Sequence, residues 1–404
     1  MTFKRIVSRC AVITALTAAM GCDGVTTAAP DPGEVFDGPL PGLTAAERAA
    51  FVRGDAAFGR PFSPAEGLGP IFNNVSCASC HSADGRGRPA NALTRFGSGS
   101  DLLRHLGGPQ LQDRAIPGAV AEQLPAGVAF SLRLPPPVFG MGLIEAIAEE
   151  TILAFADPAD ANGDGISGRP NWVTAPDYVP PGEVGGGTAP RLGRFSRKAQ
   201  VGSLMSQVTE AYHQDMGITS DLLPVENVNP LASGATHAAD RVADPELPMQ
   251  ELQAVVAYVR MLAAPAPGAL TEQRQLGQTL FRAAGCTGCH VPELRTGPNA
   301  SAALSLQPVP LYSDLLLHDM GDALADHRPD AGADGREWRT APLWGLRLMR
   351  GFLNGDAFLL HDGRARTVEE AILLHGGEAL ASRNAFAALS PAERAAVVDF
   401  VGSR

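Results

Sequence analysis

The chain has 404 residues, of which 45% are hydrophobic and 19% are charged, so its length and apolar content suffice for packed cores in two or three domains. Its formal net charge of −11 argues against binding to nucleic acid, which requires a basic surface. The chain contains 45 Gly and 33 Pro, a share that indicates long irregular segments.

Residues 1–22 have the layout of a lipoprotein-like secretory signal, with a basic start and an apolar run over residues 11–20. Cys22 follows Ala-Met-Gly, which resembles the cleavage box of bacterial lipoproteins. Residues 23–42 are polar and rich in Pro and Gly, which predicts a flexible tether. No second apolar run is long enough to span a membrane. We therefore expect a periplasmic protein that reaches the membrane only through a lipid anchor.

A capping box that begins at Thr44 predicts a helix that ends near Phe58. Beyond this helix, residues 77–81 read CASCH, and a related string, CTGCH, follows at residues 286–290. The motif residues are Cys77, Cys80, His81, Cys286, Cys289 and His290. From the composition of the chain, roughly 0.002 such strings are expected by chance, so the pattern indicates a function.

Three chemistries use cysteines and histidines in this way. A zinc site usually has its two ligand pairs close in sequence, whereas these pairs lie about two hundred residues apart. A thioredoxin-like dithiol needs a βαβ context, which neither flank shows. Covalent c-type haem accounts for every position, because two sulfurs bind the vinyl groups and the histidine ligates iron. We interpret the motifs as two covalently bound haem c groups, with zinc and a dithiol as the alternatives.

A second helix is predicted over residues 145–156, and residues 157–169 follow it with four oxygen donors at the spacing of a calcium-binding loop. These donors are Asp160, Asn162, Asp164 and the carbonyl of Ile166. Asn171 stands where an EF-hand carries a bidentate glutamate. A shorter calcium loop and an Asx-rich turn therefore both remain open.

The middle of the chain predicts a boundary between two domains. Apolar residues at helical spacing predict a helix over 250–262, and a run rich in Ala and Pro follows it. A further helix, over 271–284, leads directly into the second motif. We expect an N-terminal haem domain over 43–264 and a C-terminal haem domain over 268–404. The expected fold is mainly α and loop-rich, with two cytochrome c-like domains.

The C-terminal region predicts a helix that carries a histidine. Thr367 and Glu370 have capping-box spacing, and His375 lies on the apolar face of the helix that follows them. An imidazole on that face is placed to reach a buried iron from the side opposite His290, and a core histidine bonded to a backbone carbonyl is the alternative. A last helix begins at the capping residue Ser390.

These strings carry a family resemblance. CTGCH, LLLHDMG (315–321), EWRTAPLWG (337–345) and FLLHDGRARTVEEAILLH (358–375) occur in an order that is similar to the C-terminal haem domain of bacterial di-haem cytochrome c peroxidases. With GLGPIFNNVSCASCH, FGMGLIEAI and DANGDGISGRPN added, the chain from about residue 45 to 403 resembles their relatives, the di-haem oxidoreductase family.

The resemblance implies roles for individual residues. His375 stands where these relatives usually ligate the C-terminal haem with methionine, which implies His/His ligation and a lower reduction potential. Glu145 lies in the region of their catalytic glutamate, although a solvated glutamate at a helix start is the alternative. Their usual distal histidine is missing, so we expect an open or weakly held sixth site at the N-terminal haem. The other candidate ligands are His105, Met141, His213 and Met216.

The resemblance implies an exported peroxidase-like enzyme. Electrons from a small redox protein would enter at the C-terminal haem, and peroxide or oxygen would react at the N-terminal haem. The alternative is a periplasmic electron-transfer cytochrome without a substrate of its own.

Overall fold

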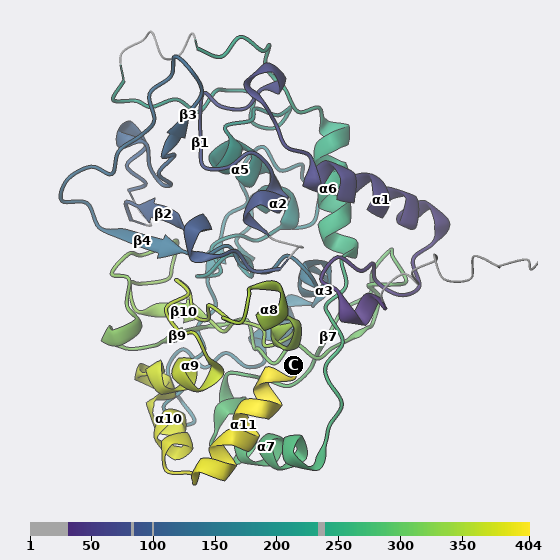
Figure 1. The fold of residues 1–404 in the computed structure, drawn as a ribbon, viewed down its shortest axis with the longest axis vertical. Helices are drawn as coiled ribbons and strands as arrows, with labels where there is room; N and C mark the ends of the chain where they lie inside the picture. Colours follow the sequence, from purple (N-terminus) through teal and green to yellow (C-terminus); the bar gives the residue numbers. More distant parts are fainter. Residues whose placement is uncertain (1–30, 82–84, 99–100, 233–238) are drawn as a thin grey trace, which may run out of the picture.

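The computed structural model describes residues 31–81, 85–98, 101–232 and 239–404 (Figure 1). Its α-helices are α1 (Ala45–Gly59), α2 (Cys77–Cys80), α3 (Met141–Ala146), α4 (Glu149–Leu153), α5 (Leu204–Met216), α6 (Met249–Met261), α7 (Glu272–Ala283), α8 (Leu346–Phe352), α9 (Val368–Leu374), α10 (Leu380–Ala387) and α11 (Pro391–Gly402). Long irregular segments connect these helices, which confirms the mainly α, loop-rich fold. The predicted signal sequence and Cys22 lie outside the described residues. Within the described ranges, no helix combines the length and the hydrophobicity that crossing a bilayer requires.

The strands are short and form two-stranded antiparallel ribbons. They are β1 (Ile71–Phe72), β2 (Leu93–Phe96), β3 (Arg114–Ala115), β4 (Phe130–Arg133), β5 (Trp172–Val173), β6 (Arg191–Leu192), β7 (Leu294–Arg295), β8 (Pro308–Val309), β9 (Leu317–Asp319) and β10 (Glu337–Arg339). The pairs are β1 with β3, β2 with β4, β5 with β6, β7 with β8 and β9 with β10. In the last pair, Trp338 lies opposite His318. Ribbons of this size position loops and do not form a layer of their own.

Helices with strong local signals form where the sequence predicts them. The Thr44 side chain accepts a hydrogen bond from the backbone N–H of Glu47, and the capping box is complete. Ser390 caps α11 in the same way, and Thr271 caps α7. At α9, Thr367 accepts from the backbone N–H of Glu370 as predicted. Each cap satisfies backbone groups that the helix leaves unpaired, which fixes the first turn.

The predicted helix over 145–156 is wrong, because two short helices replace it. α3 ends at Ala146, and α4 begins at Glu149 after an extended residue. The cause is the guanidinium of Arg194, which donates to the carbonyls of Ile144 (3.0 Å) and Ile147 (2.6 Å). These bonds satisfy carbonyls at the end of α3 and stop the helix there.

The predicted flexible tether is wrong for residues 31–42, which pack against the body of the protein. Phe36 is 1% exposed and stacks on Phe139, with ring centroids 5.0 Å apart. The backbone N–H of Leu40 donates to the carbonyl of Met261 at the end of α6 (2.8 Å). Burial of these two apolar side chains outweighs the polar composition around them. The remainder of that prediction, residues 23–30, lies outside the described part of the chain.

The largest buried core joins both halves of the chain. It includes Phe51 and Leu252 from the predicted N-terminal domain and Val309 and Trp344 from the predicted C-terminal domain. A smaller core holds α7 against α11, with Phe281 and other aromatic residues between them. Figure 1 shows α1, α5 and α6 in one half of the molecule and α7, α10 and α11 at the opposite end. The predicted boundary at residues 265–267 therefore does not separate two independent cores.

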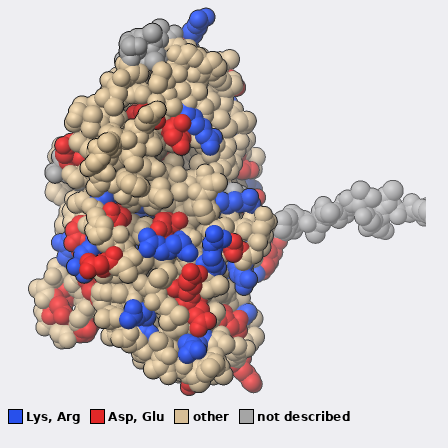
Figure 2. All heavy atoms as spheres, turned by 60° about the vertical axis from the view of Figure 1, so that its left-hand side comes forward, with Lys and Arg blue, Asp and Glu red and all other residues tan. Residues whose placement is uncertain are grey.

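The surface carries charges of both signs. On the face shown in Figure 2, acidic and basic side chains alternate over the lower half, while much of the upper half is uncharged. No single sign of charge dominates this face.

Candidate functional site

The second motif lies at the end of α7 and borders a cavity of about 220 Å³, which we call the C-terminal cavity. Gly285 adopts a left-handed backbone (φ +81°) that ends the helix and starts the turn Cys286–Gly288. Both motif cysteines and His290 line the cavity, and so does His375. The structure thus brings together four predicted site residues from segments that are about eighty positions apart.

The two histidines of this cavity are held in the same manner. His290 donates from Nδ1 to the carbonyl of Tyr312 (2.9 Å), and His375 donates from Nδ1 to the carbonyl of Ala371 (2.7 Å). Burial lowers the pKa of His290 to about 4 and also lowers that of His375. Both rings are therefore neutral, with Nδ1 engaged and Nε2 available. A carbonyl that fixes the ring through one nitrogen is the usual support for a metal-bound histidine.

The walls of the C-terminal cavity are mostly apolar. Phe281 and Leu343 line it, together with Val368 and Ile372 from α9. Apolar walls between two neutral imidazoles, with two cysteines at the rim, suit a flat macrocycle with an iron at its centre. The residues present therefore fit haem.

The first motif borders a second cavity, of about 190 Å³, which we call the N-terminal cavity. Ser76 caps α2, which carries the two cysteines, and His81 follows directly. Burial lowers the pKa of His81 to about 4, and its Nδ1 is buried without a hydrogen bond in the described structure. Met141 and Met216 also line this cavity. Of the histidines in the described residues, His81 alone lines it.

The other candidate ligands lie elsewhere. His213 donates from Nε2 to the carbonyl of Val225 (2.9 Å), and neither His213 nor His105 lines the N-terminal cavity. Of the four candidate ligands of the N-terminal haem, the two histidines therefore do not line the cavity, whereas the two methionines do.

One thiol of each motif is held in its protonated form by burial. Burial raises the pKa of Cys80 and of Cys286 to about 11, so both stay protonated near neutral pH. Since the thiolate is the nucleophile in disulfide exchange, a redox-active dithiol fits poorly here.

Helix α5 lines the N-terminal cavity with polar side chains that the sequence analysis missed. Gln207, Glu210 and Gln214 all face this space, at the spacing of one helix face. Tyr178 donates its hydroxyl to Glu210 (3.0 Å), and Gln214 also donates to this carboxylate. The signal that could have revealed them is this polar stripe on an otherwise buried helix.

Glu145 is held by an ion pair and a backbone hydrogen bond, and its catalytic role stays a prediction. Its side chain is 6% exposed, and its carboxylate binds Arg260 Nε (2.6 Å) and the backbone N–H of Leu204 (2.7 Å). It lines neither cavity. The carboxylate thus caps α5 and neutralises a partly buried cation, and both of its oxygens already accept hydrogen bonds.

The predicted calcium loop folds as an Asx-rich turn. Asp160 accepts from the N–H of Gly165, Asn162 from that of Asp164, and Asp164 from that of Ile166. Ile166 also lines the C-terminal cavity with its side chain. The backbone amides alone account for the geometry of the turn, and calcium binding at this loop stays a prediction.

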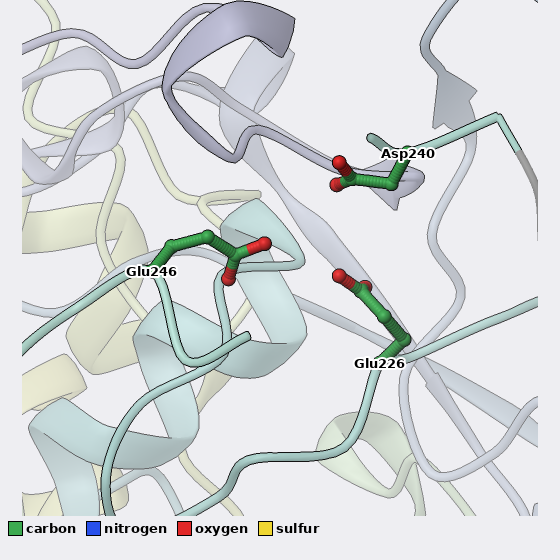
Figure 3. A group of neighbouring side chains, drawn as sticks. All are labelled: Glu226, Asp240 and Glu246. Atoms are coloured by element: carbon green, nitrogen blue, oxygen red, sulfur yellow. The ribbon is translucent and has the colours of Figure 1, made fainter. Parts of the chain in front are cut away.

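Three carboxylates converge at another place, which the sequence did not indicate. Figure 3 shows Glu226, Asp240 and Glu246 pointing toward one another, with an oxygen of each within 4.8 Å of the others. Burial and the neighbouring carboxylates raise the pKa of Glu226 to about 10. The group therefore holds a proton at neutral pH.

A buried imidazolium borders the C-terminal cavity. His318 donates from Nε2 to Asp314 (2.8 Å) and from Nδ1 to Glu378 (2.7 Å). Burial lowers its pKa, but these hydrogen bonds outweigh burial and raise it to about 12. Glu378 also accepts from Ser167 (2.7 Å), so it ties the loop after α4 to the C-terminal region.

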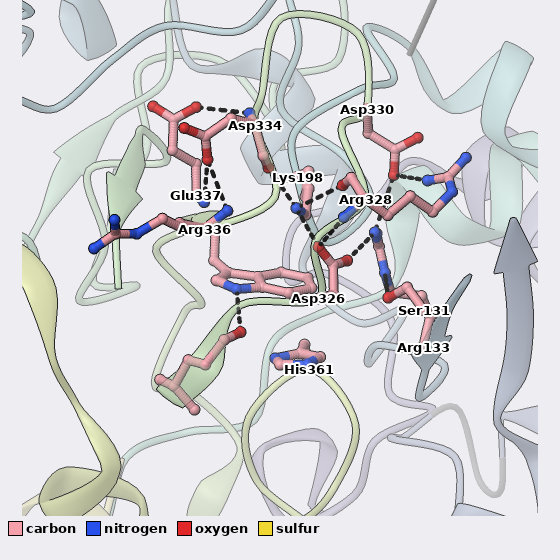
Figure 4. Close-up of polar contacts among 12 residues, drawn as sticks. Ser131, Arg133, Lys198, Asp326, Arg328, Asp330, Asp334, Arg336, Glu337 and His361 are labelled. Atoms are coloured by element: carbon pink, nitrogen blue, oxygen red, sulfur yellow. Dashed lines mark hydrogen bonds and ion pairs between the residues drawn. The ribbon is translucent and has the colours of Figure 1, made fainter. Parts of the chain in front are cut away.

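An aromatic pair and a network of ion pairs lie beside the two cavities (Figure 4). The rings of Trp338 and His361 stack, with centroids 3.8 Å apart, and both line the C-terminal cavity. Lys198 and Arg133 lie over the Trp338 ring and are paired with Asp326 at 2.7 Å each. The network fixes the indole in one orientation at the cavity wall.

A comparison with protein families finds one that matches most of the chain. The model described as "Di-haem oxidoreductase, putative peroxidase" matches residues 15–95 and 118–404. The comparison with curated proteins finds no match.

Two solved structures show a weak overall likeness. Hydrazine synthase of Kuenenia stuttgartiensis aligns over 100% of both chains, with 16% identity and a TM-score of 0.37. A MauG-like protein associated with microbial copper homeostasis aligns over 64% of this chain and 88% of its own, with 18% identity and a TM-score of 0.30. These TM-scores carry no argument, and the assignment rests on the family model. The chain belongs to the di-haem oxidoreductase family.

Proposed function

We propose that the protein is an exported di-haem c-type cytochrome that acts as a peroxidase-like oxidoreductase. Cys286 and Cys289 would attach the C-terminal haem, and His290 and His375 would ligate its iron. The corresponding groups in the N-terminal cavity are Cys77, Cys80 and His81. The C-terminal haem would accept electrons from a small redox protein, and the N-terminal haem would be the place at which peroxide or oxygen is reduced.

The difference between the two cavities supports electron transfer at the C-terminal haem and reaction with the oxidant at the N-terminal haem. Four histidines line the C-terminal cavity, and two of them, His290 and His375, are each held through Nδ1 by a backbone carbonyl and leave Nε2 available. Together these two would saturate an iron and favour electron transfer. The N-terminal cavity offers His81 as its one histidine among the described residues, which leaves a coordination position for an oxidant. This contrast is the observation that carries the proposal.

Haem supplies the electron transfer and the iron that an oxidant can bind. The protein supplies the protons, because reducing one peroxide to two waters consumes two electrons and two protons. Two carboxylates of α5, Glu210 and Asp215, line the N-terminal cavity. We assign the proton-transfer role to Glu210, whose Oε2 accepts from Gln214 and would take up and release the proton. Tyr178 holds Oε1 in place, and Gln207 offers an amide donor to a leaving hydroxide.

The predicted location of the protein agrees with this chemistry. Covalent attachment of haem c occurs after export, and the N-terminal segment has the layout of a lipoprotein signal. We therefore place the protein in the periplasm, held to the membrane by lipid on Cys22.

One observation favours a second function, that of a non-catalytic electron-transfer cytochrome. Met141 and Met216 line the N-terminal cavity, and a thioether from either would fill the remaining position on the iron. An iron saturated in this way would pass electrons and bind no oxidant.

A spectroscopic titration of the purified holoprotein separates these functions. Visible and paramagnetic-resonance spectra are recorded with and without peroxide. The enzyme should show one low-spin haem that peroxide leaves unchanged and a second haem whose signal changes. Two low-spin haems that ignore both peroxide and cyanide would establish the electron-transfer function instead.

A further inference from the structure

Three buried arginines that line the cavities have no carboxylate within ion-pair distance among the described residues. Arg86, Arg197 and Arg339 are 6%, 8% and 9% exposed, respectively. A buried cation without a counter-charge is strongly unfavourable, so this arrangement needs an explanation.

The three arginines lie at the wall that the two cavities share. Arg197 and Arg339 line both the C-terminal and the N-terminal cavity, whereas Arg86 lines the C-terminal cavity only. Burial lowers the pKa of Arg197, and the positive charges of Arg86 and Arg339 lower it further, so both lie near Arg197. Asp362 acts in the opposite direction without forming an ion pair. Both cavities thus face one cationic wall.

The hydrogen bonds of these arginines orient them without neutralising them. Arg197 donates from Nε and Nη2 to the carbonyl of Leu134 (3.1 and 2.7 Å). Arg339 donates to the carbonyls of Ser196 (3.1 Å) and Thr340 (3.3 Å). Arg86 donates to one carbonyl, and its Nε is buried without a partner among the described residues.

Other buried cations of the protein are treated differently. Arg133 pairs with Asp326 and Asp330, Lys198 pairs with Asp326, and Arg328 pairs with Asp330 (Figure 4). Arg133, Lys198 and Arg328 thus have carboxylate partners within the protein, whereas the three buried arginines at the shared wall can still bind an anion.

We propose that Arg86, Arg197 and Arg339 bind the propionate carboxylates of both haems, so that the two cofactors share one cationic anchor. This inference rests on the proposed function, because it requires haem in both cavities. Guanidinium groups match carboxylates in a planar, two-point geometry, and haem is the ligand whose binding these cavities fit.

The shared wall has a consequence for the reduction potentials. A positive charge beside haem favours the reduced form, since reduction removes one positive charge from the iron. Arg197 lines both cavities and acts on both haems, whereas Arg86 acts on the C-terminal haem.

The test uses the holoprotein with Arg197→Gln and Arg86→Gln, the charge-retaining variants Arg197→Lys and Arg86→Lys, and Arg260→Gln as a matched control. Arg260 is a partly buried arginine that pairs with Glu145 and lines neither cavity. Spectroelectrochemistry gives the midpoint potential of each haem, and a pyridine haemochrome assay gives the haem content.

Arg197→Gln should lower both midpoint potentials, and Arg86→Gln should lower that of the C-terminal haem alone. The Lys variants should stay closer to the wild type, and Arg260→Gln should shift neither potential. Unchanged potentials in haem-loaded Arg197→Gln and Arg86→Gln, or equal shifts of both haems in Arg86→Gln, would overturn the inference.

The wild-type protein supplies a second measurement, which does not depend on how the variants fold. Propionates held by arginine stay ionised, so both potentials should be independent of pH around neutrality. A propionate that titrates there would contradict the shared anchor. A wild-type protein without haem would refute the proposed function itself. A haem-loaded wild type that does not turn over peroxide would refute the enzymatic function, whereas the shifted potentials of the variants would still support the shared anchor.

Discussion

Replacing Glu145 with glutamine should weaken the fold and leave peroxide reduction intact. The substitution keeps an oxygen that can accept from the backbone N–H of Leu204 but removes the charge that pairs with Arg260 at 2.6 Å. A hydrogen bond to a charged group contributes about 1.5 to 3 kcal/mol. Because Glu183 still neutralises Arg260, also at 2.6 Å, we expect a loss of about 2 kcal/mol, below the cost of a fully unpaired buried charge.

Glu210→Gln is the matched variant, with the opposite expected outcome. Its side-chain amide can still accept from Tyr178, so the stability should change little. Peroxide turnover should fall about 100-fold, because general acid–base catalysis typically contributes that much or more.

Both variants are compared by urea unfolding, followed by far-ultraviolet circular dichroism, and by peroxide turnover with a reduced donor. A tenfold loss of turnover in Glu145→Gln at unchanged stability would refute our assignment of this residue. Normal turnover in Glu210→Gln would remove the proposed proton-transfer group.

Three other predictions follow from the structure. His375→Ala should convert the C-terminal haem from low to high spin and let it bind cyanide, as seen in visible spectra; a persistent low-spin signal would place the ligand elsewhere. Glu378→Gln should destabilise the protein most between pH 4.5 and 6.5, as measured by urea unfolding. In the folded protein the pKa of Glu378 is lowered from 4.5 to about 2, so its contribution is lost as the pH falls toward 2. The pKa of His318 is raised from 6.5 to about 12, so its contribution is lost as the pH rises toward 12, and a pH-independent difference would contradict this. Gly142→Ala should cost about 2 to 3 kcal/mol of unfolding free energy, because the added Cβ would overlap a backbone carbonyl of α6. The control Gly59→Ala, with no atom within 4 Å of the new Cβ, should change stability by less than about 1 kcal/mol.

Local signals in the sequence predicted the elements that depend on neighbouring residues. The helices that begin at Thr44, Thr271 and Ser390 each carry their capping residue beside them in the chain. His375 was predicted from one apolar helix face, and the structure places it on the cavity that His290 lines. Such features need only contacts within a few positions, so the sequence contains them.

Features that depend on distant contacts were missed. The break between α3 and α4 depends on Arg194, which lies about fifty residues downstream and donates to the carbonyl of Ile147. No sequence pattern near Ile147 predicts this contact. Similarly, the composition of residues 31–42 suggested a tether, because an average over the segment hides the burial of Phe36. The ion pair of Glu145 was missed for the same reason, since its partner Arg260 lies 115 positions away.

The arrangement of the core bears on how two redox sites can cooperate in one chain. Electron transfer between haems requires a fixed separation, and independently packed domains joined by a linker would move relative to each other. Here one core draws residues from both sides of the predicted boundary, and Arg197 and Arg339 line both cavities. A variant that loosens this shared core should therefore slow electron transfer between the haems while both haems are still bound. The sequence assigned each motif to its own domain. It did not predict the wall shared by the two cavities, which would fix the distance between the two haems.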